Sequence, residues 1–322
     1  MGKAELQVVM SRLDLSLAPD MRADEAVHVI MQRLLALMKA SEAGVLLGTD
    51  TECLHDFRIA VRRHRVLLGQ IRGVMPQRSG VRLNRGFVWL GEVTRLSRDL
   101  DVFLEDIEDY KNRLDSASSQ ALDPLYEFFR HEQQQAHQHL VACLRSARYT
   151  QLIAACATYI ASPVAARSSL CYARLPVIDW ANQRIWRMLR RVLREGKAVD
   201  ANSPPQALHE LRKSCKKLRY LMEFFASLYP ATSIRKPIKI LKKLQDMLGE
   251  YQDVQVQQAF LATFQQFSIA ASPALQHTSV VVDSILCRLE KRQRKLRKSF
   301  KQEFGVFVGE RNQHVFKLLF KP

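Results

Sequence analysis

Two basic segments that lie far apart in the sequence share the same residue types at the same spacing. Each begins with a histidine, followed by arginines and lysines at intervals of three or four residues. They read His55-x-x-Arg58-x-x-x-Arg62-Arg63-x-Arg65 and His209-x-x-Arg212-x-x-x-Lys216-Lys217-x-Arg219. The offset is 209 − 55 = 154 residues, close to half of the 322-residue chain. Guanidinium, ammonium and protonated imidazole groups arranged in a row suit phosphate oxygens as partners.

Each segment places its charged residues on one face if it is helical. With an advance of about 100° per residue, His55, Arg58, Arg62 and Arg65 fall within an arc of about 80°. The second segment repeats the arc, and beside it runs an apolar stripe of Leu208, Leu211, Cys215, Leu218 and Met222. Like charges four residues apart repel each other, so such a row is tolerated more readily when an anion occupies it. The alternative is a solvated surface, but a solvated face need not keep one register in two copies.

The composition limits the class of protein and of partner. Lys and Arg number 49 and Asp and Glu 32, so the formal net charge is +17. Such a field attracts polyanions, namely nucleic acid, anionic membranes or polyphosphate. The six cysteines form no C-x-x-C pair, which fits a reducing compartment. The first residues lack a signal-peptide pattern, and no apolar run approaches the ~18 residues that span a bilayer. We therefore expect a cytoplasmic protein without membrane spans.

The elements that must position these residues are predicted to be helices throughout. Prolines separate long segments of helical period, and no convincing alternating strand pattern is found. The expected helices span 21–40, 51–74, 80–112, 122–147, 149–161, 178–195, 206–228, 236–265, 273–300 and 302–319. Thr51 is a candidate N-cap. The segment 161–176, with its prolines and serines, is the expected boundary between halves 1–165 and 166–322.

A second repeat follows each basic segment. Leu96-Ser97-Arg98-Asp99-Leu100-Asp101-Val102 corresponds to Leu248-Gly249-Glu250-Tyr251-Gln252-Asp253-Val254 at an offset of 152 residues. This alignment pairs Asp101 with Asp253 and leaves Asp99 opposite Tyr251. The basic arc itself carries no carboxylate pair.

In combination these motifs resemble the CHAD family, the conserved-histidine α-helical domain, over about residues 20–300. The motifs that carry the resemblance are the two histidine-headed helices, Leu90-Gly91-Glu92, Arg98-Asp99-Leu100-Asp101-Val102, Leu218-Arg219-Tyr220-x-x-Glu223 and Leu244-Gln245-Asp246-x-Leu248-Gly249. The resemblance implies an all-α fold of two four-helix bundles, related by pseudo-two-fold symmetry around a basic cleft or pore. It also implies binding of inorganic polyphosphate rather than catalysis.

The resemblance also assigns residues. It implies a ligand row of His55, Arg58, Arg62, Arg65, His209, Arg212, Lys216 and Arg219, and structural roles for Asp101 and Asp253. The chain departs from the family pattern at His64, where an apolar residue is usual. No triphosphatase-type E-x-E-x-K string precedes the first half, so the chain is expected to be a free-standing CHAD protein.

Further basic residues extend the predicted site. Arg63 and Lys217 adjoin the two rows, and Arg82, Arg85, Lys239, Lys242 and Lys243 precede the second repeat in each half. The last five belong to clusters that also include Arg78, Arg235 and Lys236, and these clusters could line the cleft or lie on plain surface. The basic run 291–298 surrounds most of a helix, so part of it must face solvent.

Three functions compete for the basic rows. Metal binding is disfavoured because neither His55 nor His209 has a second ligand one turn away. Metal-dependent hydrolysis of polyphosphate or triphosphate would need carboxylates to hold the metal. Nucleic acid would bind weakly at low salt, but base recognition needs interleaved polar or aromatic side chains. Phe57, Phe224 and Phe225 lie on the apolar side, while the position of Tyr220 is ambiguous.

We therefore predict a non-catalytic protein that binds inorganic polyphosphate, without metal or cofactor, and that resides in the cytoplasm or at polyphosphate granules. A nucleic-acid-binding protein and a metal-dependent hydrolase are the alternatives. The sequence does not indicate the oligomeric state.

Overall fold

The computed structural model describes residues 13, 15–271 and 275–322, and within them the regular elements are helices. Extended pairing is limited in this part of the chain to two isolated bridges, Arg22 with Pro176 and Arg72 with Met75. The predicted all-α class is thus confirmed. None of the described helices combines the length and apolarity that a bilayer crossing requires. The expectation about a signal peptide concerns residues outside the described part.

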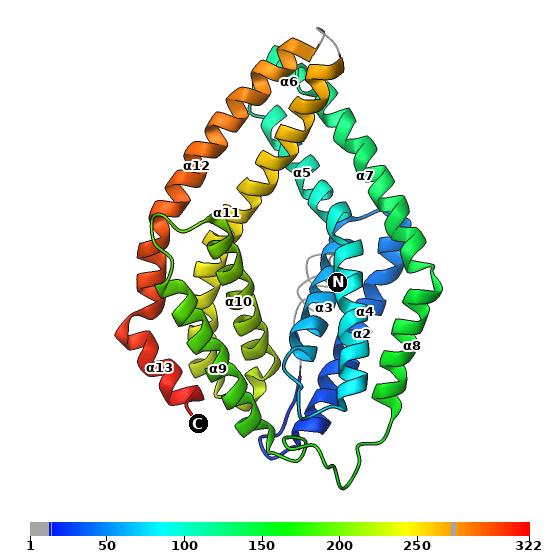
Figure 1. Cartoon of the computed structure of the whole chain (residues 1–322), viewed down its shortest axis with the longest axis vertical. Helices are drawn as coiled ribbons and strands as arrows, with labels where there is room; N and C mark the ends of the chain where they lie inside the picture. Colours follow the sequence, from blue (N-terminus) through cyan, green and yellow to red (C-terminus); the bar gives the residue numbers. More distant parts are fainter. Residues whose placement is uncertain (1–12, 14, 272–274) are drawn as a thin grey trace.

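The helices divide into two sets along the chain (Figure 1). The first set is α2 (Ala23–Leu47), α3 (Thr51–Leu68), α4 (Gln77–Val93), α5 (Arg95–Lys111), the short α6 (Ser116–Gln120), α7 (Asp123–Leu144) and α8 (Ala147–Ala161). The second set is α9 (Val177–Lys197), α10 (Pro205–Phe224), a 3₁₀ turn (Ala226–Leu228), α11 (Ala231–Ala271), α12 (Gln276–Val308) and α13 (Glu310–Phe320). The predicted boundary at 165/166 lies in the connection between α8 and α9.

The arrangement of the helices repeats at the offset of the basic motif. Helices α2 and α9, α3 and α10, and α4 and α11 each begin 154 residues apart. The neighbours correspond as well: α2 packs on α3 and α8, and α9 packs on α10 and α13. Likewise, α5 packs on α7, while the later part of the chain pairs α11 with α12. The repeat therefore includes the positions at which helices begin and the helices they pack against, in addition to the eleven-residue motif.

The two halves meet at three levels. Near the starts of α2 and α9, the Val177 backbone N–H donates to the Met21 carbonyl at 2.7 Å. Between α3 and α10, Arg63 pairs with Glu223 at 3.3 Å. Farther along, the Gln257 amide of α11 donates to Asp106 of α5 at 2.5 Å. Figure 1 shows α5, α7, α11 and α12 converging at one end, near α6.

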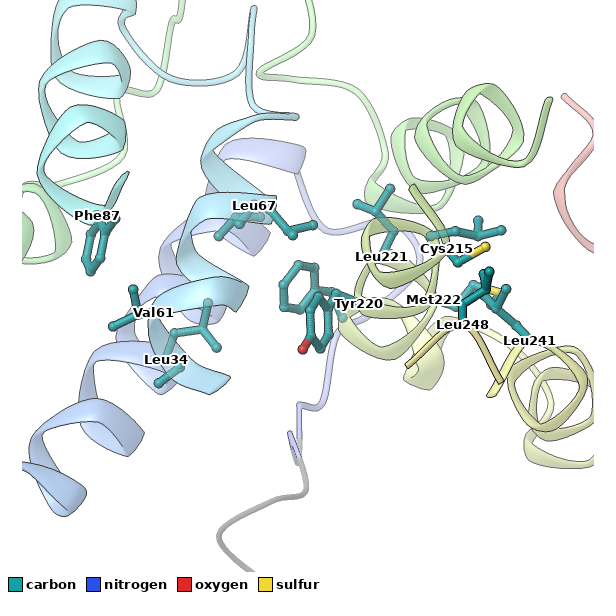
Figure 2. Close-up of a cluster of buried hydrophobic side chains, with 14 of the residues drawn as sticks. Leu34, Val61, Leu67, Phe87, Cys215, Tyr220, Leu221, Met222, Leu241 and Leu248 are labelled. Atoms are coloured by element: carbon teal, nitrogen blue, oxygen red, sulfur yellow. The ribbon is translucent and has the colours of Figure 1, made fainter. Parts of the chain in front are cut away.

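The apolar core is continuous between the halves. It contains Leu34, Val61, Leu67 and Phe87 from the first half and Leu221, Met222, Leu241 and Leu248 from the second. Figure 2 shows Tyr220 between α3 and α10, where the two groups approach each other. The apolar stripe predicted for α10 is buried, since its five residues are at most 2 % exposed. Burial of the stripe turns the adjacent basic row toward the other half.

Several predicted helix ends differ from those observed. The expected helix 80–112 is divided at Thr94, whose hydroxyl donates within its own helix to the Leu90 carbonyl at 2.9 Å. Such a side-chain bond competes with the helical pattern. The N-cap of α3 is Asp50, which accepts from the Glu52 backbone N–H at 2.8 Å, and not Thr51. The expected start of the helix 273–300 lies outside the described residues, and α12 continues to Val308.

His64 packs as an apolar residue would. Its side chain is fully buried and stacks on Phe87, with ring centroids 4.1 Å apart. Nδ1 lies 2.9 Å from the Ala60 carbonyl oxygen. Burial lowers the pKa of His64 to about 4, so the ring is neutral near pH 7 and lies outside the basic row.

Candidate anion-binding cleft

A cleft of about 1310 Å³ lies between the two halves, and both basic rows line it. Its walls come mainly from α3, α5, α10 and α11. The lining residues include the whole predicted ligand row: His55, Arg58, Arg62, Arg65, His209, Arg212, Lys216 and Arg219. Arg63 lines the cleft as well, with its guanidinium paired to Glu223. Two segments 154 residues apart in the chain thus face one space.

Three further pairs in the cleft share the same offset. Arg98 corresponds to Gln252, Asp99 to Asp253, and Val102 to Val256, and all six residues line the cleft. The offset of 152 residues is therefore wrong for this wall, because it paired Asp253 with Asp101. Asp101 is buried and accepts from the Gln133 amide at 2.8 Å. The repeat thus places one carboxylate of each half, Asp99 and Asp253, in the cleft.

The first-half row is held by neutral oxygen atoms. Arg58 Nη1 donates to the Thr94 hydroxyl at 2.9 Å and lies 3.5 Å from the Gly91 carbonyl oxygen. Burial and the nearby Arg62 lower the pKa of Arg58 to about 10, which leaves it charged near pH 7. Arg65 crosses Gly91 so closely that a Cβ atom there would lie 2.7 Å from Nη1. Burial, followed by the charge of Arg98, lowers the pKa of His55, which favours the neutral imidazole.

The second-half row is held by carboxylate and amide groups. Arg212 lies 3.8 Å from Asp253, and Arg219 donates to Glu223 at 2.9 Å and to the Gln245 amide oxygen at 2.7 Å. Nδ1 of His209 hydrogen-bonds the Gln252 amide oxygen. If Nδ1 donates this bond, Nε2 can donate to a phosphate only when the ring is protonated. His209 is thus oriented before any ligand enters.

The pKa of Lys216 is affected by cations of both rows. Burial, followed by the charges of Arg62 and Arg212, lowers the pKa of Lys216 to about 6. Arg62 belongs to α3, so this cation–cation repulsion acts across the cleft. The ammonium is therefore largely deprotonated near pH 7 while the cleft is empty. A polyanion in the cleft would reverse the local potential and favour proton uptake by Lys216.

Part of the basic lining comes from residues outside the two predicted rows. Arg95 and Arg98 of α5 line the cleft, although they were not among the predicted ligands. Arg235 of α11 lines it too, which is one of the two positions expected for its cluster. Ten Arg and Lys side chains face four carboxylates, those of Glu92, Asp99, Glu223 and Asp253. Arg95 and Arg98 were obscured by the single helix expected over 80–112.

Six predicted site residues lie away from the cleft lining. Arg82 and Arg85 face a separate groove between α4 and α8. Lys239, Lys242 and Lys243 are exposed on α11, and Lys217 is half-buried near Arg191 of α9. The prediction that the upstream clusters line the cleft is therefore corrected for Arg82, Arg85, Lys239, Lys242 and Lys243. Helical periodicity does not reveal which neighbouring helix covers a given face. In the run 291–298, Arg297 donates to the Ala201 carbonyl at 3.2 Å.

Aromatic rings in the cleft are not open to stacking. Phe57, Phe224 and Phe225 are fully buried. Tyr220 lines the cleft, but the guanidinium carbons of Arg63 and Arg219 lie 5.7 and 5.1 Å from its ring centroid. These distances are typical of cation–π contacts. The ring therefore holds two arginines in place and is not free to receive a nucleobase.

Each carboxylate contributed by the repeat lies beside an arginine. Asp99 pairs with Arg95 at 3.3 Å, and Asp253 lies 3.8 Å from Arg212. Among the described residues, no group of three or more His, Cys, Asp or Glu side chains is arranged to hold a metal ion. The arrangement can bind an extended anion through many cations.

Comparisons with known proteins agree with this architecture. The family model for the CHAD domain matches residues 29–262. The crystal structure of the CHAD domain from the plant Ricinus communis is 24% identical, covers 89% of this chain and 94% of its own, and superposes with a TM-score of 0.71. PptA from Streptomyces chartreusis is 14% identical, with coverages of 88% and 99% and a TM-score of 0.61. Both likenesses concern the fold. No curated protein matches the sequence significantly.

Proposed function

Because the chain belongs to the CHAD family, we propose that it binds inorganic polyphosphate in the cleft between its two halves. The observation that carries the proposal is the convergence of both basic rows on one cleft. Each row spans about 15 Å from its histidine to its last arginine at 1.5 Å per residue. A linear chain of phosphates can therefore contact several cations of each row at once.

The lining favours a ligand made only of phosphate groups. Charge-assisted hydrogen bonds to phosphate oxygens are the strong interactions that these side chains offer. Discrimination among bases would require hydrogen bonding to base edges or open aromatic faces. The ring of Tyr220 is engaged by Arg63 and Arg219. Nucleic acid is therefore the weaker competitor, held by its backbone charge alone.

The proposed role is binding without catalysis. Phosphoryl transfer to water generally needs a metal ion that carboxylates hold near the reacting phosphate. Asp99 and Asp253 do share the cleft, which makes hydrolysis the alternative to be tested. Their adjacent arginines make them better suited to positioning cations than to holding a metal ion. A binder of this type would be found in the cytoplasm, where polyphosphate granules gather its ligand.

Competition between two polyanions tests the ligand. Labelled long-chain polyphosphate is bound to the protein at ~150 mM salt, where weak phosphate contacts have largely faded, and is challenged with unlabelled polyphosphate or duplex DNA. We expect polyphosphate to compete far better than DNA per phosphate. Equal or better competition by DNA would contradict the proposal. Phosphate release over hours, with Mg²⁺ or with a chelator, tests catalysis, and metal-dependent release would favour the hydrolase.

A further inference from the structure

A second basic surface lies outside the cleft, in a groove of about 910 Å³ between α4 and α8. The two helices run antiparallel here, since Leu152 packs against Gly86 and Arg148 covers the ring of Trp89 at 4.4 Å. A smaller hollow continues the groove along the same helices toward Ser162. Gly86 permits this close approach, because a Cβ atom there would lie 2.4 Å from Leu152 Cδ1.

Four arginines surround this groove without compensating carboxylates. Arg78, Arg82, Arg85 and Arg148 line it and are exposed, and no Asp or Glu is among its lining residues. In the described part of the chain none of the four forms an ion pair. Other exposed arginines do have partners, such as Arg113 with Asp109 and Arg130 with Glu127. Four uncompensated cations around one groove indicate an anionic partner.

The floor of the groove is apolar, which narrows the chemistry of that partner. Leu83 and Leu152 are buried beneath it, Ala155 is half-buried, and Val81 is 44% exposed. Polyphosphate has no apolar surface to place on such a floor. Single-stranded nucleic acid would need an open aromatic face, but Arg148 covers Trp89. An occupant must therefore combine carboxylates with apolar side chains.

We propose that the α4–α8 groove docks an acidic amphipathic helix of a partner protein. Arg78, Arg82 and Arg85 are spaced i, i+4 and i+7 on α4, and they span about 10 Å along the helix. Carboxylates at i, i+4 and i+7 of a helix lying along the groove have the same spacing. The apolar face of that helix covers Val81 and the leucines below, which is the helix-in-groove mode of peptide recognition.

A designed peptide tests the proposal on the full-length protein without polyphosphate. The probe is a labelled amphipathic peptide with Glu at i, i+4 and i+7 beside a leucine face, and its control has Lys in place of each Glu. We expect only the Glu peptide to bind, with an affinity that falls as salt rises. Saturating polyphosphate should occupy the cleft and leave most of the bound peptide in place.

Two groove variants and one charge-matched variant locate the peptide. The double variant Arg82→Glu/Arg85→Glu should weaken peptide binding tenfold or more while leaving polyphosphate affinity within about twofold to threefold. Val81→Ser, which changes no charge, should weaken the peptide about threefold to tenfold through lost apolar burial. The control Lys295→Glu/Lys298→Glu makes the same change in net charge on exposed positions of α12 and should retain peptide binding. Circular dichroism checks that each variant is folded.

Three results would overturn the docking proposal. The first is that the Glu peptide does not bind. The second is that polyphosphate displaces the peptide and that the Arg62→Glu variant no longer binds it, which would place the peptide in the cleft. The third is that Arg82→Glu/Arg85→Glu weakens the binding of polyphosphate as much as the binding of the peptide, while Val81→Ser changes neither affinity. That result would make the groove an extension of the polyanion site. Failure of the protein to bind polyphosphate would count against the proposed function and leave the peptide result intact.

Discussion

The basic rows of α3 and α10 repeat one motif but are supported by different chemistry. In α3, Arg58 donates to the neutral oxygen of Thr94, and Arg65 crosses Gly91. In α10, Arg212 lies near Asp253, and Arg219 is held by Glu223 and Gln245. The central residue also differs, since α3 has the guanidinium of Arg62 where α10 has Lys216, whose pKa is lowered to about 6.

This difference assigns distinct parts to the two halves. The α3 row maintains a positive charge that carboxylates leave largely uncompensated, so it attracts a polyanion at any pH near neutrality. The α10 row has its charge partly balanced in the empty cleft, and it gains charge when Lys216 takes up a proton. The repeat thus keeps the positions of the cations, while the residues around them differ between the halves.

The largest expected effect comes from reversing one cation in each row. Arg58→Glu and Arg212→Glu should each weaken polyphosphate binding tenfold or more, because a charge-assisted hydrogen bond contributes roughly 1.5–3 kcal/mol and reversal adds repulsion. The double variant should lose a hundredfold or more, since a long ligand that bridges both rows then has no intact row. Lys295→Glu is the control, and titration with labelled polyphosphate is the measurement.

Wild-type affinity in either single variant would contradict a site shared by both rows. The variants should remain folded, because both positions line the cleft and Glu is a good helix former.

Proton linkage should distinguish the rows next. Free Lys216 is largely neutral at pH 7 and above, and a bound polyanion raises its pKa, so binding takes up a proton. Affinity should therefore fall as pH rises from 7 to 8.5, by up to tenfold per pH unit from Lys216. In Lys216→Arg the number of protons taken up on binding should fall by close to one, so the dependence of affinity on pH should be weaker. Any proton uptake by His55 and His209 would remain.

Calorimetry in buffers of different ionisation enthalpy measures the proton uptake directly. The matched substitution Lys243→Arg, on an exposed residue outside the cleft lining, should leave the slope unchanged. An unchanged slope in Lys216→Arg would mean that the two rows do not differ in this way.

Removing the carboxylates should tighten binding, and more in the second half. Asp253→Asn leaves Arg212, whose side chain is 18% exposed, free to contact phosphate, and affinity should rise about threefold to tenfold. Asp99→Asn should have a smaller effect, since the side chain of Arg95 is 71% exposed and already screened by water. Binding that weakens in both variants, together with metal-dependent phosphate release by the parent protein alone, would instead indicate a catalytic carboxylate pair.

The smallest expected effect concerns two glycines, each beside an arginine of one basic row. Gly91→Ala brings a Cβ atom to 2.7 Å from Arg65 Nη1, so the guanidinium must move, and affinity should fall about twofold to fivefold. In Gly249→Ala the nearest atom, Arg212 Nη2, is 3.8 Å away, an ordinary contact, and affinity should hold. Equal effects of the two substitutions would show that Arg65 does not depend on Gly91 for its position.

The sequence by itself determined the helical class and the membership of each basic row. Apolar and charged residues repeat with the period of a helix, and that period decides which side chains share a face. It therefore predicted that His55, Arg58, Arg62 and Arg65 would act together, and the repeat predicted a matching set. The buried stripe on α10 followed from the same pattern.

Only the tertiary structure decided what faces each row. The break at Thr94 separates α4 from α5, and Arg95 and Arg98 of α5 line the cleft. The correspondence of Asp99 with Asp253 in the repeat is visible only in the structure, where α5 and α11 line one cleft. Arg82 and Arg85 lie on a groove because α8 packs on α4. Local periodicity fixes the direction of a side chain from its own helix axis, whereas its surroundings depend on contacts between segments that are distant in the chain.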